Sequence, residues 1–283
     1  METIKNLYRF LSSRFQSLHL EYKTEFKPRF GHGLPPHDGL YEIINAERSV
    51  YQEYLKEFLG NKENLQSIKK EDSDANKPMW NNMFLPGLDI VSLYGMLVKH
   101  KPKKYIEVGS GNSTKVAKKA IIENNLDTKI ISIDPYPRAE IDHMVDQVIR
   151  MPFEDLKDFD LLNELEAGDI LFIDNSHRCL PNSDVTVFFL ETLPKLKKGV
   201  IVHIHDIYIP YDYPQFMCDR VYNEQYLLAV ALLNGSSNFD LLFPCYFISE
   251  DKELSAIMEP MWQGENTNGV EKHGGSFWFR IKA

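Results

Sequence analysis

The chain has 283 residues, which suits one large domain or a domain with an added segment. Hydrophobic residues make up 43% and charged residues 26%, an ordinary globular composition that excludes disordered, collagen-like and disulfide-scaffold classes. The 32 basic and 41 acidic side chains give a net charge of -9, and the basic residues form no run. We therefore expect no nucleic-acid partner, because binding to phosphate backbones needs clustered positive charge.

The sequence shows no export or membrane signal. Its first residues, METIKNLYRF, lack the apolar stretch of a signal peptide, and the longest apolar run, Tyr226–Leu233, is too short to cross a bilayer. Cys179, Cys218 and Cys245 form no CxxC pair and read as reduced packing residues. We expect a cytoplasmic protein without membrane association.

The first part of the chain differs in pattern from the rest. Helical periodicity extends over roughly 3–20 and 40–59, a Gly/Pro/His-rich stretch separates the two, and a polar run follows at 61–77. This pattern predicts a helical cap with a flexible connector in residues 1–80, followed by a core domain in residues 81–283. The cap would either close over a pocket or form a homodimer interface.

From about residue 88 onward, short apolar runs alternate with amphipathic helices, which is typical of a parallel sheet buried on both faces. The alternation predicts a doubly wound α/β fold with a mostly parallel seven-stranded sheet that ends in an antiparallel hairpin. The predicted strands are 105–108, 129–133, 147–150, 170–173, 200–204, 239–247 and 276–281, and the predicted helices are 88–100, 113–124, 155–165, 183–194 and 220–234.

The first predicted strand leads into a short glycine-containing loop, with Glu107 two positions before the first glycine. Gly109 and Gly111 let the backbone turn tightly and approach a ligand, and Ser113 or Thr114 can cap the helix that follows. Thr114 replaces the third glycine of the dinucleotide-binding fingerprint. A carboxylate at Glu107 would repel a pyrophosphate but suits a ligand with an ammonium group, such as an amino acid.

Further polar or aromatic residues follow the next three strands, where ligands of such sheets bind. Asp134 ends the second strand and can accept hydrogen bonds from both hydroxyls of a ribose. Phe153 and Glu154 follow the third strand and could hold an adenine, and Asp174 ends the fourth. The predicted cofactor residues are Glu107, Gly109, Gly111, Ser113, Asp134, Phe153, Glu154 and Asp174.

With these features, the sequence from about Leu88 to Ile281 resembles the Rossmann-like (class I) S-adenosylmethionine-dependent methyltransferases. The resemblance rests on E-x-G-x-G at 107–111, on Asp134 and on Phe-Ile-Asp at 172–174. The segments 169–177, 199–206 and 211–214 are similar to a bacterial subgroup often associated with polysaccharide and secondary-metabolite enzymes. The resemblance implies that the methionine part is bound by Glu107, Gly109 and Gly111, the ribose by Asp134, and the adenine side by Glu154.

A second group of chemical residues follows the fourth and fifth strands. Asp174 and His177 follow one strand, and His205 and Asp206 follow its neighbour, so the side chains should meet. Two interpretations stay open at this point. His177 or His205, assisted by Asp206, would take a proton from an acceptor hydroxyl, or all four residues would hold a divalent metal such as Mg, Mn or Fe. His203, deeper in the strand, is predicted to be a hydrogen-bonded core residue.

Two other features have both a structural and a functional interpretation. Tyr208, Tyr211 and Tyr213 lie on a proline-stiffened loop, where they would either stack on a sugar or aryl acceptor or anchor the loop. Glu224 begins an apolar helix and is either a pocket carboxylate or a capping partner, with capping favoured.

Taken together, these patterns predict an enzyme that transfers the methyl group of S-adenosylmethionine to a hydroxyl oxygen of a small molecule or sugar. One alternative is an NAD-dependent oxidoreductase, although the missing third glycine and Glu107 count against it. Another is a non-catalytic binding protein on the same scaffold, since fold alone does not establish activity.

Overall fold

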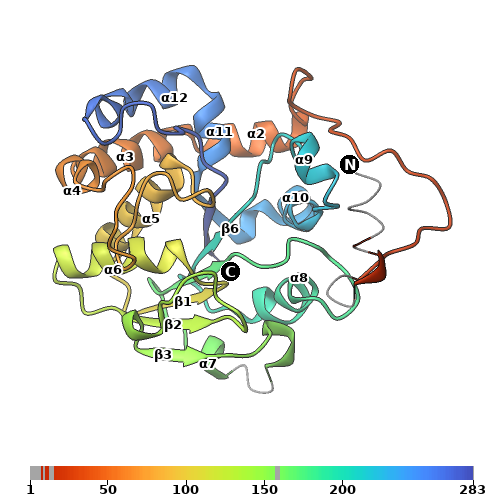
Figure 1. The fold of residues 1–283 in the computed structure, drawn as a ribbon. Coiled ribbons are helices and arrows are strands. Elements are labelled where there is room, and N and C mark those ends of the chain that lie inside the picture. The colour runs from red at the N-terminus through yellow and green to blue at the C-terminus, as the bar shows by residue number, and fades with distance from the viewer. Residues whose placement is uncertain (1–7, 9, 13–15, 157–159, 283) are drawn as a thin grey trace.

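The computed structural model describes residues 8, 10–12, 16–156 and 160–282 (Figure 1). Its centre is a seven-stranded sheet in the order β3-β2-β1-β4-β5-β7-β6. Strands β1 to β5 pair in parallel, whereas β7 runs antiparallel to both of its neighbours, β5 and β6. The strands are β1 (Lys104–Val108), β2 (Lys129–Ile133), β3 (Gln147–Ile149), β4 (Ile170–Ile173), β5 (Ile201–Ile204), β6 (Phe239–Pro244) and β7 (Phe277–Ile281). The predicted doubly wound sheet with a terminal hairpin is confirmed.

The helices lie around this sheet. They are α2 (Asp38–Ala46), α3 (Arg48–Leu59), α4 (Lys62–Gln66), α5 (Gly87–His100), α6 (Asn112–Glu123), α7 (Asp160–Asn163), α8 (Asp184–Val187), α9 (Gln215–Cys218), α10 (Glu224–Gly235), α11 (Cys245–Glu250) and α12 (Lys252–Ile257). Short 3-10 or π turns complete the set: η1 (Asp142–Met144), η2 (Phe153–Asp155), η3 (Phe188–Thr192), η4 (Leu193–Lys195), η5 (Ser236–Asn238) and η6 (Glu259–Gln263). Within the described residues, no helix has the length and apolar character needed to cross a membrane.

Several predicted elements differ from the structure. Among the described residues of the helix expected at 155–165, only the end of η2 and the short α7 are helical, and the helix expected at 220–234 begins at Glu224. The sixth strand stops at Pro244 instead of 247, because the chain turns there into α11. The helix expected at 183–194 is divided into α8, η3 and η4, and Pro194 has no N–H with which to continue a regular helix. Of the helix expected at 3–20, residues 16–20 are not helical, and residues 1–7, 9 and 13–15 lie outside the described part.

The N-terminal helices pack into the same core as the sheet. Tyr51, Leu55 and Phe58 of α3 are fully buried in one hydrophobic cluster with the strands. The Phe58 ring lies 5.1 Å from that of Phe243 on β6, and a Cβ on Gly95 of α5 would come within 2.1 Å of Phe58. Figure 1 shows α2 to α4 beside α11 and α12, far from them in sequence. A domain boundary near residue 80 stays a prediction.

Candidate active site

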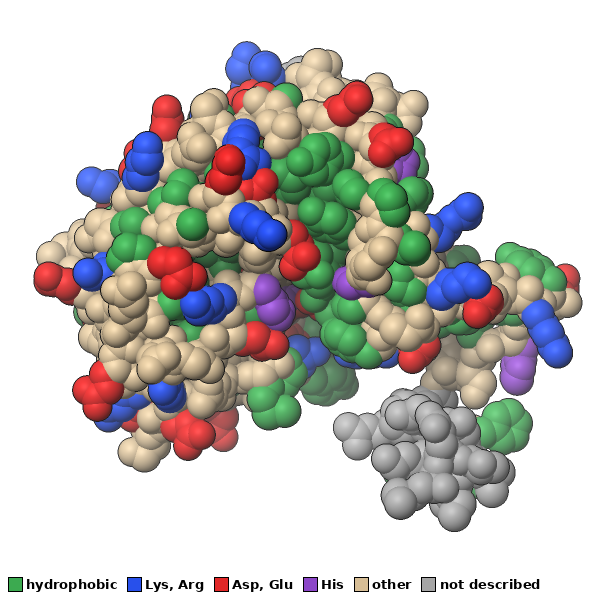
Figure 2. Space-filling view, turned by 90° about the horizontal axis from the view of Figure 1, so that it is seen from above, with side chains coloured by type: hydrophobic (Ala, Val, Ile, Leu, Met, Phe, Trp, Pro, Cys, Tyr) green, Lys and Arg blue, Asp and Glu red, His purple; other side chains and the backbone are tan. Residues whose placement is uncertain are grey.

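A cavity of about 720 Å³ lies where β4 and β5 end. Its lining includes strand-end residues, the loop around Tyr208 and the segment 80–86, which leads into α5. His32 and Trp80 also line it, so the first eighty residues contribute to its wall. In Figure 2, hydrophobic side chains gather near the middle of the face, with histidine side chains close to a hollow.

The residues predicted at the ends of β4 and β5 meet on the wall of this cavity. His177 Nε2 lies 3.4 Å from Asp174 Oδ1 and 3.4 Å from Asp206 Oδ2. His205 Nδ1 lies 3.6 Å from an oxygen of each of the same two carboxylates. Both histidines are buried, with 4% of each residue exposed. We call these four residues the strand-end cluster.

The second nitrogen of each imidazole faces a further carboxylate. His177 Nδ1 lies 3.0 Å from Glu224 Oε2, and His205 Nε2 lies 3.1 Å from Asp89 Oδ2. Glu224 and Asp89 are both fully buried. Each ring is therefore fixed on one side by a buried carboxylate, while its other side faces the strand-end carboxylates.

The sequence left the role of one of these carboxylates open and missed the other. For Glu224 a capping role was favoured over a pocket carboxylate, but α10 has no side-chain cap, and Glu224 accepts a hydrogen bond from the Asn175 side chain besides facing His177. Asp89 was missed. It also accepts hydrogen bonds from the N–H groups of Gly275 and Ser276 at 2.8 Å each, which links α5 to the segment before β7. The available signal was a lone acidic residue inside the otherwise apolar start of α5.

The carboxylates favour protonated imidazoles. Burial alone would lower the pKa of His177, but hydrogen bonds to Asp174 and Glu224 outweigh it and raise that pKa to about 10. The pKa of His205 likewise lies well above its usual value despite burial, because of Asp206, Asp174 and Asp89. Burial would raise the pKa of Asp174, yet the two histidines hold it below its ordinary value. In this arrangement both rings are therefore imidazolium cations, protonated on both nitrogens, near neutral pH.

Two residues of the strand-end cluster have left-handed backbone conformations. His177 has φ 60° and Asp206 has φ 57°. Such non-glycine conformations cost on the order of 1–3 kcal/mol each and concentrate at functional sites. The N–H groups of Asn223 and Glu224 donate to the His177 carbonyl and fix this turn against α10. This strain supports a functional role for the cluster.

His203 is a core residue, as predicted. Its ring stacks between Phe172 and Trp278, with centroid distances of 4.1 and 3.8 Å, and its Nε2 lies 2.7 Å from Ser276 Oγ. Burial lowers its pKa well below the usual histidine value. A neutral, stacked imidazole is suited to packing rather than to ligand contact.

Of the eight predicted cofactor residues, all of which are described, Asp174 lines the cavity. Glu107 is fully buried and accepts hydrogen bonds from the hydroxyls of Tyr105, Ser113 and Thr114. Thr114 Oγ also accepts from the Gly111 N–H and so caps α6. Glu107 and Ser113 thus hold the glycine loop on β1, and direct contact of either with a ligand stays a prediction.

The burial of Glu107 leads to a testable pH dependence. Burial raises its pKa to about 7, although the surrounding hydroxyls oppose the shift. The contribution of Glu107 to stability should then be greatest below its unfolded pKa of about 4.5, and it should fall by roughly 3 kcal/mol as pH rises through about 7. Glu107→Gln should flatten this decline. Urea unfolding of both proteins between about pH 5 and about pH 8 measures it, and parallel curves would contradict the assignment.

The two loop glycines have different roles. Gly109 has φ +84°, and a Cβ there would lie 1.9 Å from the Asp174 carbonyl oxygen. The space beside it is therefore filled by the end of β4, not left open for a ligand as the sequence suggested. At Gly111 the nearest atom to a Cβ is Arg138 Cβ at 3.9 Å, so this position is open.

Asp134 connects the loops that follow β1 and β2. Its carboxylate accepts hydrogen bonds from the Ser110 and Tyr136 N–H groups at 2.8 Å each. Phe153 is buried on η2, and burial raises the pKa of the neighbouring Glu154. The ribose and adenine roles of these three residues stay predictions.

The three loop tyrosines occupy different surroundings. Tyr208 lines the cavity and packs on Tyr246, with ring centroids 4.4 Å apart. Tyr211 packs against Gly31 so closely that a Cβ added to this glycine would lie 2.7 Å from the Tyr211 side chain. Tyr213 is fully buried, and its hydroxyl accepts from the Gln225 N–H. Tyr208 therefore lies on the cavity wall, where its contact with an acceptor stays a prediction, whereas Tyr211 and Tyr213 anchor the loop in this structure.

Among the residues that the structure describes, no group of three or more histidine, cysteine, aspartate or glutamate side chains is arranged to hold a metal ion. The side chains of the strand-end cluster pack against each other, and the histidine nitrogens face the carboxylate oxygens directly. The predicted metal is thus not supported by this arrangement.

Comparisons with known proteins agree with the sequence resemblance. Residues 106–207, from β1 to just beyond β5, match a family described as a methyltransferase domain. This match confirms the resemblance to Rossmann-like methyltransferases over these residues, whereas the bacterial subgroup stays a prediction. No curated protein matches the chain.

Two solved structures are similar to the chain. The methyltransferase PaMTH1 of Podospora anserina, bound to SAH, is 15% identical, with a TM-score of 0.44, and the match covers 90% of this chain and 100% of that one. A candidate methyltransferase from Thermobifida fusca is 14% identical, with a TM-score of 0.40, and the match covers 88% and 96%.

Proposed function

We propose that this protein, whose residues 106–207 form a methyltransferase domain, transfers the methyl group of S-adenosylmethionine to a hydroxyl oxygen of a small molecule or sugar. The observation that carries the proposal is the strand-end cluster on the wall of the cavity where β4 and β5 end. Ligands of such sheets bind at this edge. The cavity, at about 720 Å³, has the size of a small-molecule site.

The cluster supplies a proton acceptor for the hydroxyl. Bound S-adenosylmethionine would supply an electrophilic methyl group on a positively charged sulfur. Its positive charge near His177 or His205 would favour loss of the imidazole proton, because like charges disfavour each other at short range. The free imidazole would then accept the hydroxyl proton while the oxygen bonds to the methyl carbon and the carbon–sulfur bond breaks, with S-adenosylhomocysteine as the leaving group. Asp174 and Asp206 would stabilise the imidazolium that forms.

A divalent metal is the second candidate activator. The cluster, whose residues are all described, forms no metal site as it stands, but the way its histidines are held favours one. His177 and His205 each contact a buried carboxylate through one ring nitrogen, which is how proteins commonly orient metal-ligating histidines. The cluster would have to open around the ion, since its side chains now contact each other. Chelator treatment followed by addition of Mg, Mn or Fe distinguishes the candidates: the metal account predicts loss and recovery of turnover, and the base account predicts neither.

The ribose role of Asp134 can be tested by binding. Asp134→Ala removes an acceptor for the ribose hydroxyls and also loosens the glycine loop, so S-adenosylmethionine should bind about 10- to 100-fold more weakly. Asp146→Ala is the matched control, because the Asp146 carboxylate also accepts a backbone N–H, that of Ile130, but at the opposite end of β2 from Asp134. Equal affinities in both folded variants and the parent would remove Asp134 from the site.

Turnover tests the proposed activity itself. The protein should form S-adenosylhomocysteine when given S-adenosylmethionine and a panel of sugars and small hydroxyl compounds, in proportion to the methylated acceptor. An NAD-dependent oxidoreductase would instead bind NADH and leave S-adenosylmethionine unbound. A binding protein on this scaffold would bind S-adenosylmethionine without turnover against any member of the panel.

A further inference from the structure

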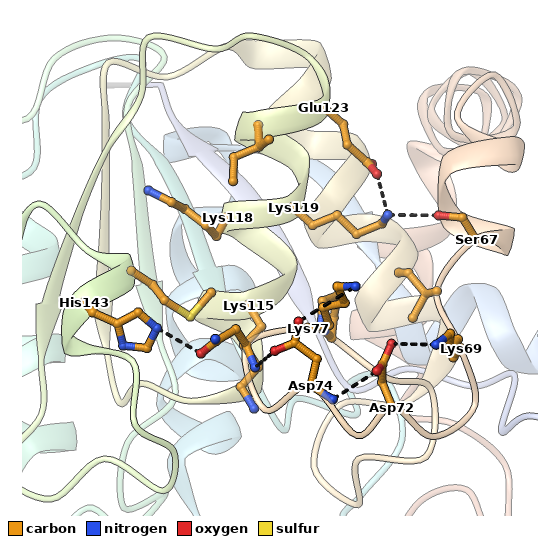
Figure 3. Close-up of a pocket in the computed structure, with 15 residues that line it drawn as sticks. Ser67, Lys69, Asp72, Asp74, Lys77, Lys115, Lys118, Lys119, Glu123 and His143 are labelled. Atoms are coloured by element: carbon orange, nitrogen blue, oxygen red, sulfur yellow. Dashed lines mark hydrogen bonds and ion pairs between the residues drawn. The ribbon is translucent and has the colours of Figure 1, made fainter.

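A second cavity, of about 460 Å³, lies between α6, the connector 67–78 and η1. It shares no lining residue with the cavity at the ends of β4 and β5. Figure 3 shows the lysines of α6 on one side of it and the connector's charged residues on the facing side. Its lining is mixed, with apolar side chains such as Ile68, Pro78 and Met144 beside the charged groups.

Three of the five lysines that line this cavity are neutralised by neighbours. Lys69 Nζ lies 3.4 Å from Asp72, and Lys77 Nζ lies 3.8 Å from Asp74. On α6, Lys119 pairs with Glu123 one turn further along. These three pairs use all three carboxylates of the lining, Asp72, Asp74 and Glu123.

The other two lysines, Lys115 and Lys118, are left without a carboxylate. Neither has a side-chain hydrogen bond or ion pair within the part of the chain that the structure describes. They lie three residues apart on α6 and therefore on the same side of the helix. Lys115 is buried, with only 6% of the residue exposed. Lysine is rarely buried to this degree without a partner, because removing an ammonium from water is costly.

We infer that this second cavity binds the phosphate group of a small molecule, with Lys115 and Lys118 as its charged contacts. A phosphate monoester carries close to two negative charges at neutral pH, which matches two unpaired ammonium groups at helical spacing. The apolar part of the wall would accept the organic portion of the ligand. The site is separate from the proposed methyl-transfer site, so its presence does not depend on that function.

Inorganic phosphate is the probe, and the melting temperature is the readout. Above the dissociation constant, the melting temperature should rise roughly with the logarithm of the phosphate concentration, and more than with chloride at equal ionic strength, because a ligand of the folded state stabilises it. Lys115→Met keeps the aliphatic stem but removes the charge, and it should weaken the apparent phosphate affinity about tenfold or more. Lys198→Met is the matched control, since Lys198 is exposed and outside both cavities, and it should behave as the parent does.

Lys118→Glu provides a second variant in case Lys115→Met does not fold. It places a negative charge beside Lys115, on a half-exposed position, and should likewise weaken the apparent phosphate affinity about tenfold or more. An apparent phosphate affinity equal to that of the parent in either folded variant would overturn the proposal, because another part of the protein would then be responsible. A rise in melting temperature that is linear in phosphate concentration and equal in all variants would overturn it too, as this is the general stabilising effect of phosphate salts.

Discussion

His177→Ala and Asp206→Ala should each lower methyl transfer about 10²–10⁴-fold while leaving the affinity for S-adenosylmethionine nearly unchanged. The reason is the role that the proposed function gives them: both side chains lie in the strand-end cluster on the cavity wall, and they would act on the acceptor hydroxyl rather than on the cofactor. His143→Ala is the control for loss of a histidine, because its ring faces Asn76 outside this cavity. Initial rates at saturating S-adenosylmethionine, with calorimetric affinities, measure both quantities.

The pH dependence adds a readout that a purely structural role would not produce. Because the carboxylates raise the pKa of His177 to about 10, kcat/KM should keep rising with pH beyond the ordinary histidine range. Asp174→Asn removes one carboxylate partner and should shift this rise to lower pH. Folded His177→Ala and Asp206→Ala proteins that methylate the acceptor at the parental rate would show that the cluster is structural.

Gly109→Ala should destabilise the protein by about 3 kcal/mol or more, whereas Gly111→Ala should change stability by less than about 1 kcal/mol. At Gly109 the added methyl meets the Asp174 carbonyl oxygen at 1.9 Å, and the backbone has a positive φ. At Gly111 the space is open, with the nearest atom at 3.9 Å. Urea unfolding of the two variants gives the comparison directly.

The same pair separates folding from binding in the glycine loop. Gly111→Ala projects a methyl group into the open space where a ligand would approach, so it should weaken S-adenosylmethionine binding in a stable protein. If Gly109→Ala instead proved as stable as the parent, the close contact between β1 and the end of β4 would be wrong.

The sheet could be predicted from sequence because its information is local. The first five strands lie in short, mostly apolar runs of the sequence. Because these runs alternate with helices along the chain, only a few sheet topologies are possible. The meeting of His177 with Asp206 followed from the same rule, since neighbouring parallel strands end at one edge. These predictions needed no knowledge of side-chain packing.

The partners of the cluster could not be predicted in this way. Asp89 approaches His205 from a helix 116 residues away in sequence, and Glu224 approaches His177 from 47 residues away. Both contacts depend on how helices pack on the sheet, which periodicity does not specify. The same holds for Tyr213: its place on a proline-stiffened loop left open whether it contacts an acceptor or anchors the loop, and the structure shows it fully buried.

A calorimetric titration with S-adenosylmethionine tests whether the cavity at the ends of β4 and β5 binds this molecule. The parent protein should bind S-adenosylmethionine stoichiometrically and saturably, Gly111→Ala and Asp134→Ala should bind it more weakly, and NADH should give no binding heat. Absence of S-adenosylmethionine binding in the folded parent, or saturable binding of NADH in its place, would show that the protein is not a methyltransferase that uses S-adenosylmethionine.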